Sequence, residues 1–390
     1  MYESKMTFKL KQETPIVHFQ FDDPEAIIRS TELKPKLDSF LKKKYGSKLE
    51  KNWYLKNTSE EAALNYKVRV YSDTLCETPA EPQRGDMYFG NMGDDAQIKK
   101  YVFYREPVTF EIVCLYRGLR AFIKESLPEF FLVTNFGTRQ SKGYGCFTLL
   151  GVSEDCLSLL NDKGYKFFYC DVESSKYQDK MFLASVIYSV MKGGINRSGY
   201  NKGQYKNPRA YVKGFIQREY IDSLPDGRNI GSDKALIKRS VIPNFKNLPE
   251  HGNSPKLNYK KYYFFRALLG LADHYEFKDD IRRGNVQIKN DDIQRFKSPI
   301  TISFVGNRLY FIFDDSYKPL LGKTFVLEND RISKNRVQVQ VPSVFDVKDF
   351  IHKFVDYYNS PEVGEALYEL GGVNSSYDPA SEITLFEGGI

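Results

Sequence analysis

The sequence predicts an α+β protein built from two tandem modules, on three observations. The chain has 390 residues, enough for two domains of ordinary size. Hydrophobic residues make up 41%, with 29 Phe and 28 Tyr, which fills ordinary cores and excludes a disordered chain. Roughly the first 150 residues follow the order strand, helix, strands, helix, strand, which is the order of a ferredoxin-like (RRM-like) sandwich.

The chain opens with a predicted strand, turn and helix. Residues 6–21 alternate apolar and polar side chains and predict one or two strands, interrupted at Thr14-Pro15. Asp22-Asp23-Pro24 predicts a turn. Apolar residues then recur at helical spacing across residues 27–45, with Ser30 or Thr31 as the N-cap.

The remainder of the first module is predicted from the same two periodicities. Alternation predicts strands at residues 65–71, 99–104, 108–113 and 144–151, and a short apolar run predicts a buried strand at 130–134. Helical spacing of Leu115, Leu119, Phe122 and Ile123 predicts a helix over residues 115–126.

A second module begins near Tyr165, so we place the domains at residues 1–160 and 161–390. Its predicted elements include helical and loop insertions. Helices are expected at 181–191, 210–220, 262–274 and 344–358, loops at 192–209 and 222–257, a hairpin at 300–313 and a loosely ordered tail after residue 371.

The net charge of +7 and the pI of about 8.8 are compatible with a nucleic-acid partner. Five cysteines without a Cys-x-x-Cys pair, and a polar N-terminus, indicate free thiols in a reducing cytoplasm. Apolar runs are too short to cross a bilayer. Scattered histidines and cysteines give no ligand spacing, so we expect neither metal nor cofactor.

The strongest functional signal is the loop at residues 135–145. Its three glycines allow backbone angles closed to other residues, and their amides could point at phosphate oxygens. Arginine, lysine and hydroxyl side chains between them add charge and donors. The spacing is not that of a nucleotide P-loop. The loop side chains and glycines predicted to bind are Gly137, Thr138, Arg139, Ser141, Lys142, Gly143, Tyr144 and Gly145. The alternative is a long mobile hairpin with solubilising charge.

The pattern Gly-x-Arg-x-x-x-Gly-x-Gly in this loop resembles the glycine-rich loop of the RAMP superfamily of CRISPR proteins. Thr14-Pro15 and residues 27–34 (Ile-Ile-Arg-Ser-Thr-Glu-Leu-Lys) resemble further segments of that superfamily. Residues 295–300 (Arg-Phe-Lys-Ser-Pro-Ile) resemble a segment of subunit one of the type III-B (Cmr) effector complex, the family to which the chain is most similar.

The resemblance implies two tandem RAMP modules and a non-enzymatic, RNA-binding subunit of a type III effector in antiviral defence. The expected partners are guide RNA, target RNA and other RAMP subunits. Arg29 and Lys34 would face the RNA backbone at the start of the first helix, beside the glycine-rich loop. Arg295 and Lys297 are further candidates from the matching C-terminal segment.

A second basic cluster lies in residues 192–209. Arg197 and Lys202 alternate there with tyrosines, and rings between cations suit single-stranded RNA because bases stack while cations follow phosphates. A flexible, solvated loop is the alternative.

Two other functions stay open. The first is a RAMP-superfamily endoribonuclease that uses His18 as a general acid–base, or Asp22 and Asp23 to assist metal-dependent cleavage. A lone histidine beside Phe19 and Phe21 is typical of a structural residue, and Asp-Asp-Pro is an ordinary turn. The second is a protein-interaction subunit whose glycine loop docks a protein and no RNA.

Overall fold

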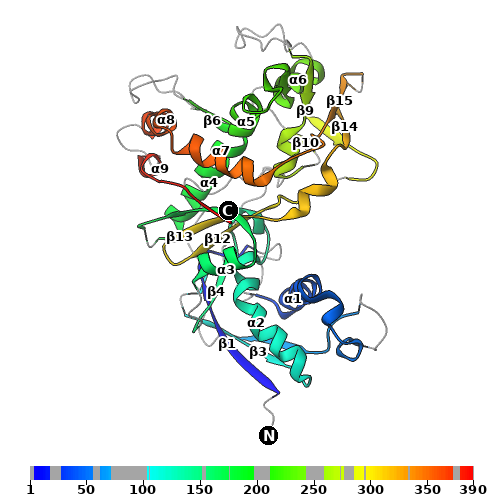
Figure 1. Ribbon diagram of the computed structural model, residues 1–390, viewed down its shortest axis with the longest axis vertical. Helices are drawn as coiled ribbons and strands as arrows, with labels where there is room; N and C mark the ends of the chain where they lie inside the picture. Colours follow the sequence, from blue (N-terminus) through cyan, green and yellow to red (C-terminus); the bar gives the residue numbers. More distant parts are fainter. Residues whose placement is uncertain are drawn as a thin grey trace.

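The computed structural model describes residues 4–17, 28–55, 62–71, 103–104, 106–151, 155–174, 176–196, 211–242, 259–272, 274–275, 285–293, 296–332, 334–371 and 378–389. The fold is mixed α/β, and its two four-stranded sheets are antiparallel. Figure 1 shows the first of these sheets at the end that carries the N-terminus, the second in the middle, and a six-stranded sheet at the opposite end.

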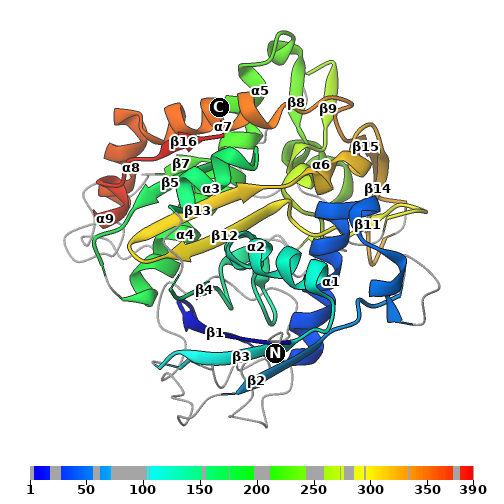
Figure 2. The same ribbon diagram turned by 60° about the horizontal axis from the view of Figure 1, so that its bottom comes forward.

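The first sheet has the strand order β2-β3-β1-β4. Its strands are β1 (Lys5–Gln12), β2 (Lys67–Tyr71), β3 (Val108–Val113) and β4 (Phe147–Leu149), and its helices are α1 (Ser30–Tyr45) and α2 (Arg117–Val133). Alternation along β1 points Leu10 into the core and Lys9 to solvent. Both helices cover the same face of the sheet (Figure 2), and no helix of the described residues lies over its other face.

Helix α2 corrects the predicted strand at residues 130–134, because the helix runs on to Val133. Phe130 and Phe131 pack into the core of the first sheet, whereas Leu132 packs with Leu160 and Phe167 of the second sheet's layer. A helix buried on two sides carries apolar residues in succession, which removes the helical periodicity from the sequence.

The second four-stranded sheet has the order β12-β13-β5-β16. Its elements are β5 (Lys166–Asp171), α4 (Tyr177–Lys192), β12 (Ile300–Val305), β13 (Arg308–Phe313), α7 (Val347–Tyr358) and β16 (Phe386–Gly388). The predicted hairpin at 300–313 and the last long helix are confirmed. In both sheets the chain runs strand, helix, strand, strand, helix, strand, and the four strands take the same spatial order.

The long connection between α4 and β12 carries most of an inserted six-stranded sheet, and the strands between β13 and α7 complete it. Its strands are β8 (Ile230–Ser232), β9 (Lys261–Tyr263), β10 (His274–Tyr275), β11 (Val286–Lys289), β14 (Thr324–Asn329) and β15 (Arg336–Gln340), with α6 (Asp233–Val241) packed against it. Smaller elements are α3 (Cys156–Asp162), α5 (Glu219–Asp222), α8 (Pro361–Gly371), α9 (Asp378–Ser381), β6 (Gly194–Asn196), β7 (Tyr211–Lys213) and the 3-10 helices η4 (Gln140–Lys142), η5 (Phe215–Gln217) and η9 (Phe265–Leu269).

Four predictions for the C-terminal half are wrong. The helix predicted over 210–220 is a strand followed by short helical turns, and the one predicted over 262–274 is β9, η9 and β10, broken where Gly270 has a φ of 110°. The predicted loops at 222–257 contain β8 and α6. The tail beyond the glycine that ends α8 contains α9 and β16, and β16 closes the second sheet by pairing with β5.

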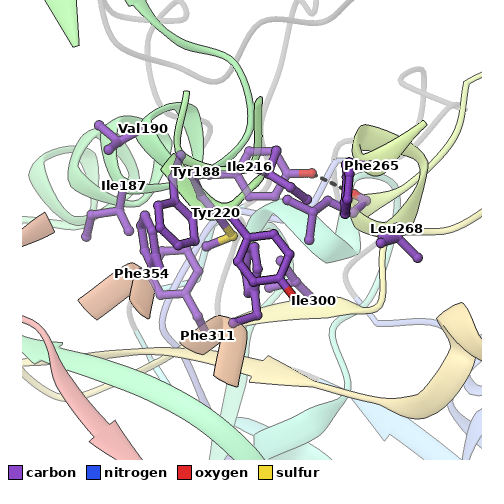
Figure 3. Close-up of a cluster of buried hydrophobic side chains, with 14 of the residues drawn as sticks. Ile187, Tyr188, Val190, Ile216, Tyr220, Phe265, Leu268, Ile300, Phe311 and Phe354 are labelled. Carbon is purple, nitrogen blue, oxygen red and sulfur yellow. Dashed lines mark hydrogen bonds between the residues drawn. The ribbon is translucent and has the colours of Figure 1, made fainter. Parts of the chain in front are cut away.

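The second core is a dense cluster of aromatic and aliphatic side chains. Figure 3 shows Tyr188 of α4 with other members of this cluster, among them Ile216 of η5, Leu268 of η9 and Ile300 of β12. The cysteines within the described residues are free thiols. Among these residues, no helix combines the length and apolar character that a bilayer crossing requires.

A histidine on α7 ties this helix to the C-terminal strand. His352 Nδ1 lies 2.8 Å from Glu387 Oε1 of β16, and His352 Nε2 lies 3.6 Å from Asp356 Oδ2. The hydrogen bond and charge of Glu387, followed by the charge of Asp356, raise the pKa of His352 above its ordinary value. The charged imidazolium therefore stabilises the attachment of β16.

This arrangement predicts a pH-dependent contribution to stability. Because the folded-state pKa of His352 is raised, the contribution is complete below its unfolded value and is lost as the pH rises through the folded value. We expect His352→Gln to lower the free energy of unfolding by about 0.5 kcal/mol near pH 5.5 and by less near pH 9, because the group is exposed. Urea unfolding at both pH values measures this, and an equal loss at both would contradict it.

Candidate nucleic-acid interface

The glycine-rich loop, residues 135–145, and the adjoining Cys146 connect α2 to β4 and pack against the second sheet. Asn135 Nδ2 donates hydrogen bonds to Gln140 O at 2.7 Å within the loop and to Ile302 O of β12 at 2.8 Å. Cys146 Sγ lies 3.3 Å from both the nitrogen and the carbonyl oxygen of Phe304. The loop therefore forms the junction between the two sheets.

Two of the glycines are required by this close packing. Gly143 has a φ of 83°, and a Cβ there would lie 2.5 Å from the Phe304 ring. Gly145 has a φ of 68°, and a Cβ there would lie 1.9 Å from Phe136 O. The sequence correctly indicated special backbone angles in this loop, but the space they create is filled by the protein itself.

The expectation that the loop amides are open to phosphate is wrong for six of them. Three donate outside the loop: Gly137 N to Glu32 Oε1, Thr138 N to Val17 O and Gly145 N to Pro15 O, each at 2.8 Å. Three donate within the loop: Phe136 N to Gly145 O at 2.9 Å, Lys142 N to Arg139 O at 2.8 Å and Gly143 N to Gln140 O at 3.3 Å. The glycine positions thus have a structural role, and any contact with an anion falls to side chains.

The loop side chains divide into buried and partly exposed groups. Tyr144 is fully buried in the second core. Thr138, Arg139, Ser141 and Lys142 are partly exposed, and Arg139 adopts a left-handed φ of 57° immediately before η4. This conformation places an arginine at the outer turn of the loop.

Two lysines from different elements meet at the ring of Tyr188. Lys142 Nζ lies 3.1 Å from the ring centroid and Lys192 Nζ, at the end of α4, lies 5.9 Å from it. Desolvation and then the charges of Lys192 and Arg139 lower the pKa of Lys142 well below its ordinary value. Burial and the charge of Arg266 lower the pKa of Lys192 to about 8, although Asp233 opposes this. Within the described residues, neither amine forms an ion pair with a carboxylate.

A second pair of cations lies on the other side of the loop. Lys36 Nζ donates to Glu32 Oε1 and to Asn135 O, both at 2.7 Å. Burial lowers the pKa of Lys36, and the charge of the exposed Lys297 adds to that effect against the opposing Glu32. Lys297 was predicted from the sequence, and the structure brings its charge within range of Lys36, which holds Asn135 O of the loop.

The two cations predicted at the start of α1 have different surroundings. Arg29 is the N-cap residue of α1 in place of the expected Ser30 or Thr31, and its side chain is partly exposed. Lys34 Nζ donates to Asp38 Oδ2 at 2.8 Å and to Leu64 O at 2.9 Å. The Lys34 ammonium is therefore already held by acceptors within the first module.

Six candidates lie outside the described residues: His18, Asp22, Asp23, Arg197, Lys202 and Arg295. Sequence reasoning missed Lys192 as a partner of the loop, because nothing in the sequence shows that the end of α4 lies beneath residue 142. Its signals were its place at the start of the second basic cluster, residues 192–209, and at the end of α4, where a lysine also suits the helix dipole.

Comparison with protein families matches residues 3–195 to the Cmr1 N-terminal domain and residues 211–367 to the Cmr1 C-terminal domain. The chain belongs to the Cmr1 family. This confirms the resemblance to the RAMP superfamily drawn from the loop and the flanking segments.

Solved structures give two further similarities to this Cmr1 family member. One is the crystal structure of Cmr1 from Pyrococcus furiosus in its apo form, at 10% identity and a TM-score of 0.41, covering 90% of this chain and 96% of that one. The other is a cryo-EM structure of the type III-B Cmr-beta bound to cognate target RNA, at 17% identity and a TM-score of 0.25, covering 37% of this chain and 58% of that one. No curated protein matches the chain.

Proposed function

We propose that the chain is an RNA-binding, non-enzymatic subunit of a type III-B CRISPR effector, and that it contacts guide RNA or the guide–target duplex at the junction of its two sheets. Membership of the Cmr1 family supports the effector role. Neighbouring RAMP subunits, guide RNA and target RNA are the partners we propose. A cytoplasmic location is the accompanying expectation from the free thiols.

The observation that carries the RNA contact is the gathering of Arg139, Lys142 and Lys192, which we call the junction cations. Burial lowers the pKa of both lysines, and the charges of Lys192 and Arg139 lower the pKa of Lys142 further. A polyanion at the junction would offset the repulsion among these cations. Arg139 and Lys142 are partly exposed, whereas Lys192 donates to the carbonyl of Gly270 at 3.0 Å and adds to the local potential.

We also infer that each four-stranded sheet with its helices is a ferredoxin-like module. The identical strand orders and the identical succession of elements support this. The core of the first sheet is built from residues up to Phe147, and β5 begins at Lys166, which supports a module boundary near residue 160. By this topology β5 and α4 belong to the second module, although the match to the Cmr1 N-terminal domain extends over them.

The proposal predicts that the double substitution Arg139→Ala/Lys142→Ala weakens binding of single-stranded RNA. We expect a loss of about tenfold at low salt and a decrease of about 1.4 in the slope of log K against log salt, because two phosphate contacts are removed. Fluorescence anisotropy with labelled oligouridylate, at several salt concentrations, measures both quantities.

The matched control is Lys289→Ala/Arg336→Ala, which removes the same two charges from exposed positions of the six-stranded sheet. This control should keep its RNA affinity within about twofold. Equal affinities for the two double variants would contradict the placement of RNA at the junction.

The endoribonuclease alternative is tested with the same RNA. Incubation with and without Mg²⁺ should leave the RNA intact if the subunit only binds. Cleavage that disappears in His18→Ala or Asp23→Ala would replace the non-enzymatic assignment.

A further inference from the structure

The first sheet has a second face, opposite α1 and α2, that carries a regular array of cations. Its described side chains come from alternate positions of the strands and are Lys5, Thr7, Lys9, Lys11, Lys67, Arg69, Tyr71, Thr109, Glu111, Val113 and Thr148. We call this surface the outer face. Its residues on β1 and β2 are all exposed. Figure 2 shows α1 and α2 on the opposite face, and none of the helices in the described part of the chain lies over this one.

The strand register arranges the outer face in rows. Lys5 and Lys67 lie on either side of Val113, and Thr7 and Arg69 lie on either side of Glu111. Adjacent strands are about 4.8 Å apart and alternate residues along a strand are about 6.7 Å apart. The second spacing is comparable to that of consecutive phosphates along an extended single strand.

Positive charge is in excess on this face. Glu111 accepts from Lys5 Nζ and, at 3.0 Å, from the hydroxyl of Tyr71. At the end of β1, Lys11 Nζ lies 3.0 Å from the carboxylate of Glu13. Among the described residues, the remaining cations Lys9, Lys67 and Arg69 form no ion pair.

The composition of the outer face favours a polynucleotide over a protein partner. Protein–protein interfaces are depleted of lysine and have an apolar centre. Here lysines and an arginine surround a centre made of Glu111, Thr7 and Thr109. Val113 is the one aliphatic side chain among the described residues of this face. Long, flexible cations around hydroxyl groups suit the sugar–phosphate backbone, which has regularly spaced charge and no fixed side-chain shape.

We propose that the outer face of the first sheet is a second RNA-binding surface, which holds the sugar–phosphate backbone without reading its sequence. It is separate from the junction, because the glycine-rich loop contacts α1 through Glu32 and α1 covers the opposite face of the sheet. The inference rests on the proposed function in that the chain must bind RNA at all. Two surfaces on one chain would follow an RNA strand over a longer path than the junction alone.

The test is the double substitution Lys9→Gln/Lys67→Gln in the full chain, with labelled oligouridylate as the probe. We expect RNA affinity to fall about tenfold at low salt, and the salt slope to decrease by about 1.4, as two phosphate contacts are lost. The control is Lys289→Gln/Lys348→Gln, at two exposed lysines of β11 and α7. This control should change affinity by less than about twofold.

The outcomes separate this inference from the proposed function. If Arg139→Ala/Lys142→Ala weakens RNA binding and Lys9→Gln/Lys67→Gln matches its control, the junction stands and the outer face is overturned as an RNA surface. If the wild-type chain binds no RNA, the proposed function itself fails. If the outer-face variant keeps its RNA affinity but no longer assembles with the neighbouring effector subunits, the face belongs to an acidic protein surface and the inference is wrong.

A fold measurement accompanies the binding assay. The chain has a single tryptophan, and Trp53 is buried in the core of the first module. Its fluorescence during urea unfolding should give the same midpoint for wild type and for Lys9→Gln/Lys67→Gln, because both side chains are exposed on the sheet. A loss of RNA affinity at an unchanged unfolding midpoint supports the proposal. If the midpoint also falls, the affinity of Arg69→Gln decides: a loss at an unchanged midpoint supports the outer face, and an unchanged affinity overturns it.

Discussion

Gly145→Ala should lower the free energy of unfolding of the first module by about 3–5 kcal/mol, at the upper end of single substitutions. The added Cβ would lie 1.9 Å from Phe136 O and 2.7 Å from its carbonyl carbon, which are backbone atoms that no rotamer change can move. Shifting the loop would break the hydrogen bonds from Gly145 N to Pro15 O and from Phe136 N to Gly145 O. Urea unfolding followed by Trp53 fluorescence measures the loss.

The matched control is Gly151→Ala. Gly151 also has a positive φ, 79°, but no atom lies within 4 Å of the position its Cβ would take. This variant should therefore lose about 1 kcal/mol, the cost of a left-handed alanine alone. Equal losses in the two variants would show that the close approach at the loop has no energetic consequence.

The Gly145 result would also bear on how RNA reaches the junction. The loop amides are committed to Glu32, Pro15 and Val17, so the glycines bring the loop close to β12 and present Arg139 and Lys142 at the surface. A loop displaced by Gly145→Ala would move those two cations. The same variant, assayed under conditions where it remains folded, should therefore bind RNA more weakly than Gly151→Ala.

The sequence predicted well the elements whose periodicity arises from one buried face. Helix α7 has such a face and was correct. The hairpin at 300–313 was also correct, although β13 is buried on both faces. Sequence reasoning failed for a helix buried on two sides, as in α2 at Phe130–Phe131–Leu132, and where an apolar run folds into several short elements, as around Gly270. In each case the deciding contact comes from a segment far away in the chain.

The candidate site shows the same limit. Three glycines and two cations in eleven residues indicated an unusual loop, and the left-handed angles of Gly137, Gly143 and Gly145 confirm that part. Whether the amides face solvent depended on Glu32, more than one hundred residues away along the chain. Lys192 and Tyr188 are neighbours by helical spacing on α4, but the approach of Lys142 to them depended on the packing of α4 against the loop, for which no local pattern exists.

Asp233→Ala should be the second severe substitution, with a loss of about 3–5 kcal/mol in the free energy of unfolding, because it leaves a buried cation without its partner. Asp233 is fully buried at the start of α6, and its Oδ2 accepts from Arg266 Nε at 2.7 Å and also from Nη2. Arg266 also stacks against Tyr275, with its Cζ 4.6 Å from the ring centroid. Urea unfolding followed by far-ultraviolet circular dichroism measures the effect in the C-terminal module.

The double variant Asp233→Leu/Arg266→Met is the control that isolates the pair. Replacing both charges with apolar side chains of similar size removes the uncompensated guanidinium, so this variant should be more stable than Asp233→Ala. It also removes the Arg266 charge that lowers the pKa of Lys192, leaving one fewer cation beside Tyr188. If Asp233→Ala lowers the free energy of unfolding by only about 0.5 kcal/mol, as a substitution at an exposed position does, the Asp233–Arg266 pair is not buried in solution. A large loss for Asp233→Ala, reversed in the double variant, would mean that the cost lies in the unpaired buried guanidinium of Arg266, so that the fold requires the two charges to be matched and not merely present.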